Sequence, residues 1–129
     1  MENGQTINPD NLMDEPDVVI TPKEGTYTLM MVDPDAPKPN APKYRSWLHW
    51  LVINIPANDV ARGEEVLGYQ PPEPAEGRHR YLYLLFKQHG RVTTRQPAKR
   101  QGFQVREWAK EHELGNPVNG LFFWSSADA

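Results

Sequence analysis

The stretch WLHWLVINI at residues 47–55 decides the fold class of this chain. It is a nearly continuous apolar run, about half as long as the ~20 residues that a membrane-spanning helix needs. A short apolar run of this kind is typical of a β-strand that is buried on both faces. We therefore expect a β-sheet in which this strand lies at the centre.

The rest of the chain also favours short strands. Thirteen prolines and nine glycines divide the 129 residues into extended pieces, which suits one mostly β domain better than a helical bundle. We expect no second domain, and a frayed tail at residues 125–129. The expected strands are 17–20, 26–32, 47–55, 81–87 and 118–124, with loops at 34–42 and 57–74.

One amphipathic helix is expected near the end of the chain. Val105, Trp108, Ala109 and His112 fall at i, i+3, i+4 and i+7, with charged residues between them. This spacing predicts a helix of about ten residues with one apolar face. Gly115 is expected to end it, because glycine readily adopts the backbone conformation that follows a helix.

Composition excludes several classes of protein. The chain has no cysteine, so it has no disulfide, thiolate nucleophile or cysteine metal site. A net charge of −3 argues against direct nucleic-acid binding. No signal peptide or transmembrane segment is visible, so we expect a soluble, cytoplasmic protein, for which peripheral membrane contact stays open.

Charge is distributed unevenly along the chain. Residues 1–35 hold eight acids and one base, whereas residues 78–110 hold nine bases and one acid. The basic segment indicates either an electropositive face for phosphate-bearing partners or an ordinary solvated surface.

Two carboxylates stand at the end of an expected strand. Asp33 and Asp35 are two residues apart, so on an extended chain both would point into one volume, and Pro34 and Pro37 would stiffen the turn. Like charges at such a distance repel, so a partner for them is expected.

Two histidines are the candidate partners. His49 lies among apolar neighbours, and taken alone it is more typical of a buried core histidine. His79 lies two residues after Gly77, between Arg78 and Arg80, at the entrance to an expected strand. Because glycine allows close approach to the backbone, this position favours a functional role. Trp47 and Tyr81 each stand two residues from one of these histidines, so they are expected to form an apolar wall beside them. Trp50 and Phe123 are expected in the core.

Three kinds of chemistry use these side chains. A divalent metal site is conceivable, but no histidine spacing fixes a coordination geometry, so we expect neither a metal nor a cofactor. A metal-assisted or acid/base hydrolase is a second hypothesis, although no nucleophile motif is present. Binding of a phosphate or a zwitterion is the third, because imidazole and backbone N–H groups donate to phosphate and a carboxylate orients the imidazole.

Four motifs in order carry a resemblance to a known family. They are DPDAP at 33–37, RSWLHWLVINIP at 45–56, GYQPP at 68–72 and GRHRY at 77–81. In this order and spacing they resemble the phosphatidylethanolamine-binding protein family. That family includes the Raf kinase inhibitor proteins and the plant flowering regulators of the flowering-locus-T and terminal-flower type. Further matches extend the resemblance from about residue 3 to residue 124.

The resemblance implies a central antiparallel sheet, a second smaller sheet, one or two peripheral helices and an anion pocket. It also implies a non-enzymatic signalling protein that binds phosphate or phospholipid head groups and restrains partners such as protein kinases. An interaction protein with an idle pocket, binding through Arg95, Lys99 and Arg100, is the alternative. Carried over by motif, the pocket residues are Asp33, Asp35, Pro37, Trp47, His49, Pro71, His79 and Tyr81.

The chain departs from the family pattern in three ways. It starts at Met1 without the usual N-terminal segment, so we expect a sheet edge that is either exposed or covered by a partner chain. It stops five residues after Trp124, without the C-terminal helix of the animal kinase inhibitors, so a more open pocket is expected. Trp47 matches neither the tyrosine nor the histidine that the two plant types carry at this position.

Overall fold

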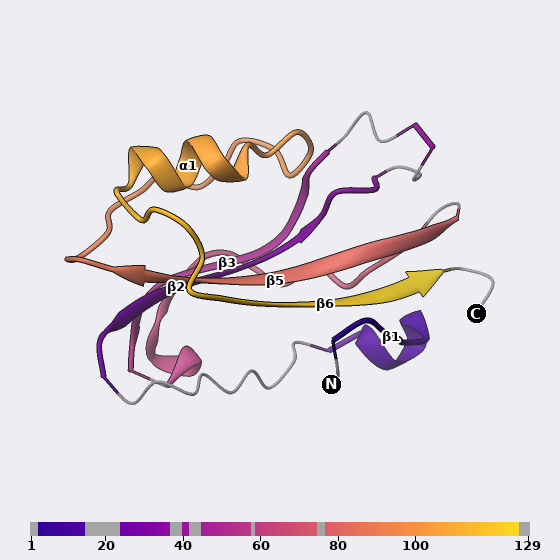
Figure 1. The fold of residues 1–129 in the computed structure, drawn as a ribbon, viewed down its shortest axis with the longest axis horizontal. Helices are drawn as coiled ribbons and strands as arrows, with labels where there is room; N and C mark the ends of the chain where they lie inside the picture. Colours follow the sequence, from indigo (N-terminus) through magenta and orange to yellow (C-terminus); the bar gives the residue numbers. More distant parts are fainter. Residues whose placement is uncertain are drawn as a thin grey trace.

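The computed structural model describes residues 3–14, 24–36, 40–41, 45–57, 59–74 and 77–126. Their strands form one six-stranded sheet in the order β1-β6-β5-β2-β3-β4, and α1 lies against one face of it (Figure 1). Two short 3-10 turns complete the described elements. In chain order they are β1 (Gln5–Thr6), η1 (Pro9–Leu12), β2 (Thr26–Asp33), β3 (Trp47–Pro56), η2 (Val60–Arg62), β4 (Glu64–Leu67), β5 (Arg78–Gln88), α1 (Val105–Glu111) and β6 (Asn119–Ser126).

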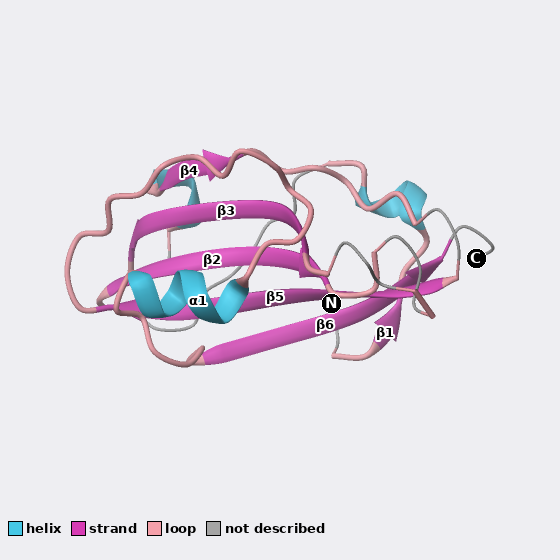
Figure 2. Ribbon diagram, turned by 90° about the horizontal axis from the view of Figure 1, so that it is seen from above, coloured by secondary structure: helices cyan, strands magenta, loops and turns pink. Residues whose placement is uncertain are grey.

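The expected mostly β fold is confirmed, with a correction to the sheet. β2, β3, β4, β5 and β6 pair antiparallel with their neighbours, but β1 runs parallel to β6, so the sheet is mixed. Figure 2 shows the strands side by side, with α1 over β2 and β5 toward one end of these strands. All strands of the described residues belong to this sheet, so the second, smaller sheet is not found among them.

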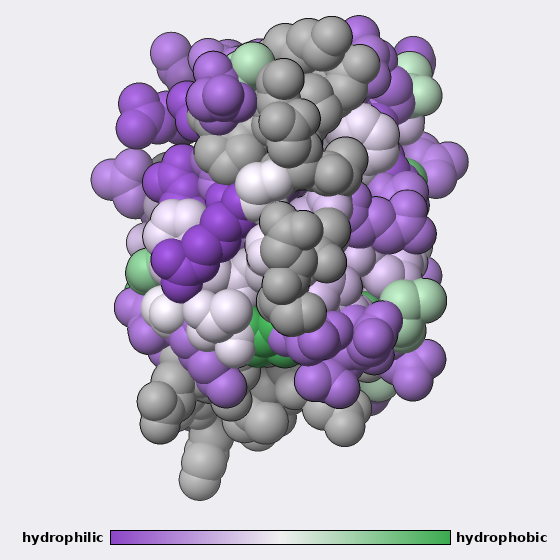
Figure 3. Space-filling view, turned by 90° about the vertical axis from the view of Figure 1, so that its right-hand side faces the viewer, coloured by the Kyte–Doolittle hydropathy of each residue, from purple (hydrophilic) through white to green (hydrophobic). Residues whose placement is uncertain are grey.

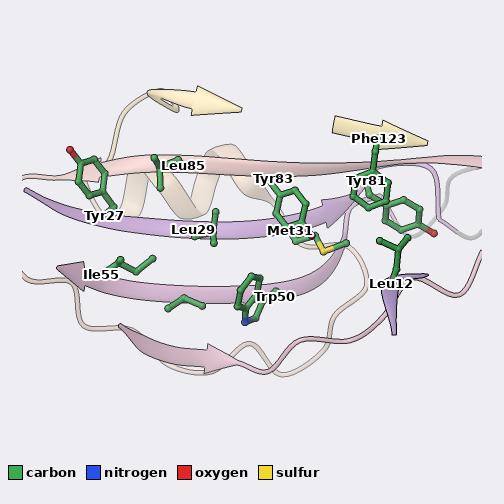
Figure 4. Packing of buried hydrophobic residues seen from close by; sticks show 11 residues of the cluster. Leu12, Tyr27, Leu29, Met31, Trp50, Ile55, Tyr81, Tyr83, Leu85 and Phe123 are labelled. Atoms are coloured by element: carbon green, nitrogen blue, oxygen red, sulfur yellow. The ribbon is translucent and has the colours of Figure 1, made fainter. Parts of the chain in front are cut away.

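Alternation along β2 explains why both faces of the sheet are buried. Tyr27, Leu29 and Met31 point to one face, and Met30 and Val32 point to the other, where α1 packs. We call the first group the tyrosine-rich core and the second the helix-side core. The tyrosine-rich core comprises Leu12, Tyr27, Leu29, Met31, Trp50, Val52, Ile55, Tyr81, Tyr83, Leu85 and Phe123, most of which Figure 4 labels.

The expected strands at 26–32, 47–55, 81–87 and 118–124 are confirmed, each with slightly different bounds. The expected strand at 17–20 lies outside the described residues. The expected fraying from residue 125 is wrong for Ser125 and Ser126, which belong to β6. Ser125 is fully buried, and its hydroxyl donates a hydrogen bond to the Ile7 carbonyl at 2.6 Å.

The position expected for β3 is also corrected. The strand is buried on both faces, as its apolar run predicts. It is not central, however, because β4 forms in the segment expected to be irregular and becomes the edge strand beside it. β5 and β2 occupy the middle of the sheet instead.

Helix α1 is confirmed but is shorter than expected, at seven residues. It ends before His112, whose ring Nδ1–H donates to the Trp108 carbonyl at 2.7 Å. Glu113 then adopts a left-handed backbone (φ 57°), so the helix ends well before Gly115. No helix in the described part of the chain is long and apolar enough to cross a membrane.

Candidate functional site

His49 is the extra residue of a β-bulge. Its neighbours Leu48 and Trp50 pair with the consecutive β2 residues Val32 and Met31, which leaves His49 without an opposite residue on β2. A bulge of this kind redirects a side chain, often near functional sites. The His49 side chain consequently joins the face of the sheet that carries the tyrosine-rich core.

Gln70 holds His49 and Trp47 in place. Its backbone N–H donates to the His49 carbonyl at 2.9 Å, and its own carbonyl lies 2.6 Å from Nδ1 of His49. Its side-chain Oε1 accepts a hydrogen bond from Nε1 of Trp47 at 2.6 Å. Because a carbonyl oxygen only accepts, the proton of a neutral His49 ring sits on Nδ1, and Nε2 carries the lone pair.

The environment of His49 favours its neutral form. Burial lowers its pKa below the ordinary 6.5, and the nearby charges of Arg100 and His79 act in the same direction. The hydrogen bond to Gln70 and the charge of Asp33 oppose this shift without cancelling it. His49 is therefore predominantly uncharged at neutral pH.

Asp33 and His79 form a buried pair. Oδ2 of Asp33 lies 2.7 Å from Nδ1 of His79, and the two residues are 3% and 2% exposed. The other carboxylate oxygen, Oδ1, accepts the backbone N–H of Asp35 at 2.7 Å. The Asp33 carboxylate thus orients the His79 ring and holds the turn that follows β2.

Asp35 has a different partner from Asp33. Its carboxylate accepts the backbone N–H of Arg80 at 2.7 Å and two guanidinium hydrogen bonds from the same residue at 2.9 and 3.1 Å. The expectation that both acids point into one volume is therefore wrong. The strand ends at Asp33, so the alternation rule does not extend to Asp35, which turns toward Arg80.

The arginine also decides the charge state of Asp35. Burial by itself would raise the pKa of this carboxyl. The hydrogen bonds from Arg80, together with the charges of Arg80 and His79, outweigh burial and bring the pKa below its ordinary 3.8. Arg45 adds a more distant contact, at 3.9 Å from Oδ1. The charge of Asp35 is thus neutralised by Arg80.

Tyr81 packs against both histidines. Its ring centroid is 5.4 Å from that of His49, in an edge-to-face arrangement, and 6.2 Å from that of His79, stacked at 17°. Its other contact is with Phe123, at 5.3 Å. Figure 4 shows Tyr81 and Phe123 near Leu12 at one end of the tyrosine-rich core. Burial also raises the pKa of Tyr81 above its ordinary value, so it stays protonated.

The structure therefore brings together Asp33, His49, His79 and Tyr81. Trp47 joins them through Gln70, and Pro71, which is partly buried, follows Gln70 directly. Pro37 lies outside the described residues. The core placement of Trp50 and Phe123 is confirmed, with exposures of 1% and 0%. Sequence reasoning missed Gln70 and Arg80, although both lie inside the quoted motifs.

The described residues contain no cluster of three or more acids, histidines or cysteines arranged to hold a metal ion. Figure 3 views the end of the molecule where β2 ends and β5 begins. Hydrophilic residues make up much of its described surface. A separate cavity of about 1010 Å³ lies between α1 and β5, lined by Leu82, Leu84 and Lys110 among others.

Arg100 supports the backbone around His49. Its guanidinium donates to the carbonyls of Leu48, His49 and Gly68 at 2.9 to 3.1 Å. Arg100 is therefore not a free surface cation. The alternative hypothesis, binding of a partner through Arg95, Lys99 and Arg100, required it to be one. Arg95 and Lys99, by contrast, are exposed.

Comparisons with known proteins agree with this fold. The family model described as phosphatidylethanolamine-binding protein matches residues 1–123. The protein FLOWERING LOCUS T of Arabidopsis thaliana is 42% identical over 124 residues, which cover 94% of this chain and 71% of that protein. The protein SELF-PRUNING of Solanum lycopersicum is 41% identical over 125 residues, with the same coverage.

Solved structures show the same architecture. The solution structure of CG7054 superposes with a TM-score of 0.76 at 33% identity, covering 97% of this chain and 77% of that one. A carboxypeptidase Y inhibitor, solved with its cognate proteinase, has a TM-score of 0.78 at 20% identity and covers 95% of this chain and 76% of that one. The curated relatives above are signalling regulators rather than enzymes, as the motifs predict.

Proposed function

Because the chain belongs to the phosphatidylethanolamine-binding protein family, we propose that it is a non-enzymatic regulator that binds a phosphate or phosphoethanolamine-type head group. The site is the end of the sheet where β2 ends and β5 begins. The observation that carries the proposal is the packing of His49 and His79 against the same residue, Tyr81, with Asp33 holding His79.

The chemistry of these side chains suits a small zwitterion. An imidazole either donates an N–H to a phosphate oxygen or accepts an O–H from a phosphate, according to its tautomer, and a carboxylate such as Asp33 attracts an ammonium group. Arg80 already neutralises Asp35, so this acid repels an anion less than a free carboxylate would. The proposed ligand-contacting residues are Asp33, Asp35, Pro37, Trp47, His49, Pro71, His79 and Tyr81.

The proposed partners are signalling proteins, protein kinases among them, whose binding the head-group site controls. This extends to the present chain the regulatory character of its relatives. A cytoplasmic location and peripheral contact with phospholipid head groups are parts of the same proposal.

Isothermal titration calorimetry with phosphoethanolamine tests the ligand. We expect saturable binding at millimolar concentration for the unaltered chain and its loss in Asp33→Ala and His79→Ala. The matched control is His89→Ala, because His89 is exposed beyond the end of β5. Circular dichroism checks that each variant is folded. Absence of saturable binding by the folded, unaltered chain would overturn the proposal.

A pull-down with a candidate kinase tests the regulatory half. If the variants that lose phosphoethanolamine also lose the kinase, the head-group site controls the partner. If they keep it while Arg95→Ala and Lys99→Ala lose it, the site is idle and this half of the proposal fails.

A further inference from the structure

His49 is fixed more firmly than a ligand-binding side chain usually needs. Its carbonyl accepts hydrogen bonds from the backbone of Gln70 and from the guanidinium of Arg100, both at 2.9 Å. Its ring Nδ1 is bound to the Gln70 carbonyl at 2.6 Å. Neither the backbone nor the ring of His49 can change its orientation without breaking these contacts.

The consequence lies on the other side of the ring. With Nδ1–H bound to a carbonyl, Nε2 of the neutral ring can only accept a hydrogen bond. No described residue donates to it, whereas Nδ1 of His79 is bound to Asp33. His49 therefore presents a fixed acceptor on the sheet face where the proposed ligand binds.

The charges facing His49 make this acceptor hard to convert into a donor. Arg100 lies beneath it and His79 on β5 near it, and both disfavour a second proton on the ring. Asp33 on β2 favours that proton, and buried Tyr81 is uncharged. Burial also lowers the pKa of His49, as Arg100 and His79 do, so the ring stays neutral.

We propose that the site selects oxyanions that bring their own proton, such as a phosphate monoester in its monoanionic form, which donates O–H to Nε2 of His49. This inference rests on the proposed function and adds the class of ligand. A fully deprotonated oxyanion would instead place its lone pairs against that of Nε2, which is repulsive.

Sulfate provides the matched comparison. A phosphate monoester has a second pKa of about 6, so its monoanion still carries a proton below that pH. A sulfate monoester of the same shape has no proton to lose between about pH 5 and 8. Phosphoethanolamine and 2-aminoethyl hydrogen sulfate therefore differ at the site chiefly in this one hydrogen.

The experiment titrates the unaltered protein with both compounds by calorimetry at about pH 6 and 7.5. At the lower pH we expect the sulfate ester to bind more weakly than phosphoethanolamine does, by roughly tenfold or more. This difference corresponds to one lost hydrogen bond. The affinity for phosphoethanolamine should fall toward higher pH, and that for the sulfate ester should not. Inorganic phosphate and sulfate repeat the comparison without the ammonium group.

The possible results separate this inference from the proposed function. If the two esters bind within about twofold of each other at both pH values, the anion site stands and proton selection is wrong. If neither ester nor either inorganic anion binds, both proposals fail. A third result is that the two esters bind equally, whereas inorganic phosphate binds and inorganic sulfate does not. In that case the ammonium group of the esters donates to Nε2 of His49, which also overturns the inference for phosphoethanolamine.

A variant gives a second readout. His49→Gln places an amide N–H near the position of Nε2, so it should bind the sulfate ester nearly as well as phosphoethanolamine, with little pH dependence. His89→Gln is the control and should keep the discrimination of the unaltered chain. The ligand comparison on the unaltered chain decides the inference even if His49→Gln does not fold.

Discussion

Oδ2 of Asp33 and Nδ1 of His79 lie 2.7 Å apart on the adjacent strands β2 and β5. Both residues are almost completely buried, so the environment shields their interaction from water. Asp33 also accepts the N–H of Asp35, which ties this histidine to the turn after β2.

Asp33→Ala should destabilise the fold strongly. The substitution leaves two buried donors, the Asp35 N–H and the His79 ring, without their acceptor. Each is expected to cost about 1–3 kcal/mol in the free energy of unfolding. Urea denaturation measures the loss. Asp33→Asn keeps one carbonyl oxygen and should lose less, so equal losses for the two variants would contradict this assignment.

Arg80→Met should make the protein more sensitive to acid. In the unaltered chain the pKa of Asp35 lies below 3.8, so its stabilising effect is complete above that pH and disappears as pH falls through the lowered pKa. Arg80→Met removes the guanidinium hydrogen bonds and charge but keeps the backbone N–H of residue 80 and the charge of His79, so burial weighs more, the pKa of Asp35 rises and stability is lost at higher pH.

Circular dichroism during acid titration should therefore show a higher unfolding midpoint for Arg80→Met. Arg78→Met is the control, because Arg78 hydrogen-bonds Thr6 and lies over Trp124, and it pairs with no carboxylate among the described residues. An unchanged midpoint in Arg80→Met would show that Asp35 does not depend on Arg80.

His49 should make stability depend on pH near neutrality. Its pKa in the folded state is below 6.5 because of burial, so the unfolded chain binds more protons just below that pH. The free energy of unfolding must then fall as pH drops from 6.5 through the folded-state pKa. His49→Gln should flatten this part of the profile, measured by denaturation at several pH values. An identical slope in His49→Gln would assign the effect to another group.

Arg100→Ala should destabilise the protein more than its surface neighbour does. Truncation removes the donor to three carbonyls on β3 and at Gly68, and about 1–3 kcal/mol is expected for the partners left unsatisfied. Lys99→Ala, at an exposed position, should change stability by less than about 0.5 kcal/mol. Thermal unfolding of the pair measures the difference, and similar losses would place Arg100 among ordinary surface cations.

Tyr83→Phe should leave stability unchanged or increase it slightly, by up to about 1 kcal/mol. The Tyr83 hydroxyl is buried and has no hydrogen-bond partner in the described structure, so its desolvation is uncompensated. Tyr27→Phe is the opposite case, because its hydroxyl donates to the Glu24 carbonyl at 2.8 Å, and it should lose about 1 kcal/mol. Chemical denaturation compares the two, and a large loss in Tyr83→Phe would reveal a partner for that hydroxyl.

The sequence predicted what depends on local patterns. The apolar runs of β2, β3 and β5 identified strands, and the motifs identified Asp33, His49, His79 and Tyr81 as neighbours. The two-residue strand β1 carried no such signal. Gln5 and Thr6 are polar, and they form a strand only because β6, at the far end of the chain, lies beside them.

The roles of Arg80 and Gln70 in the site also depend on contacts with distant parts of the chain. The partner of Asp35 depends on how the turn after β2 meets β5, and the role of Gln70 depends on how the segment after β4 returns to β3. Both are non-local contacts. Helix α1 is shorter than its apolar spacing predicts because the ring of His112 caps the helix before Gly115 is reached.

The bulge in β3 has a consequence for how this site could change. Leu48 and Trp50 already pair with the consecutive residues Val32 and Met31 and lie on opposite faces of the sheet, so the pairing of β2 with β3 at this point does not use His49. Position 49 is thus an insertion that strand pairing does not require. Substitutions there can alter ligand chemistry one residue at a time while the surrounding sheet keeps its register.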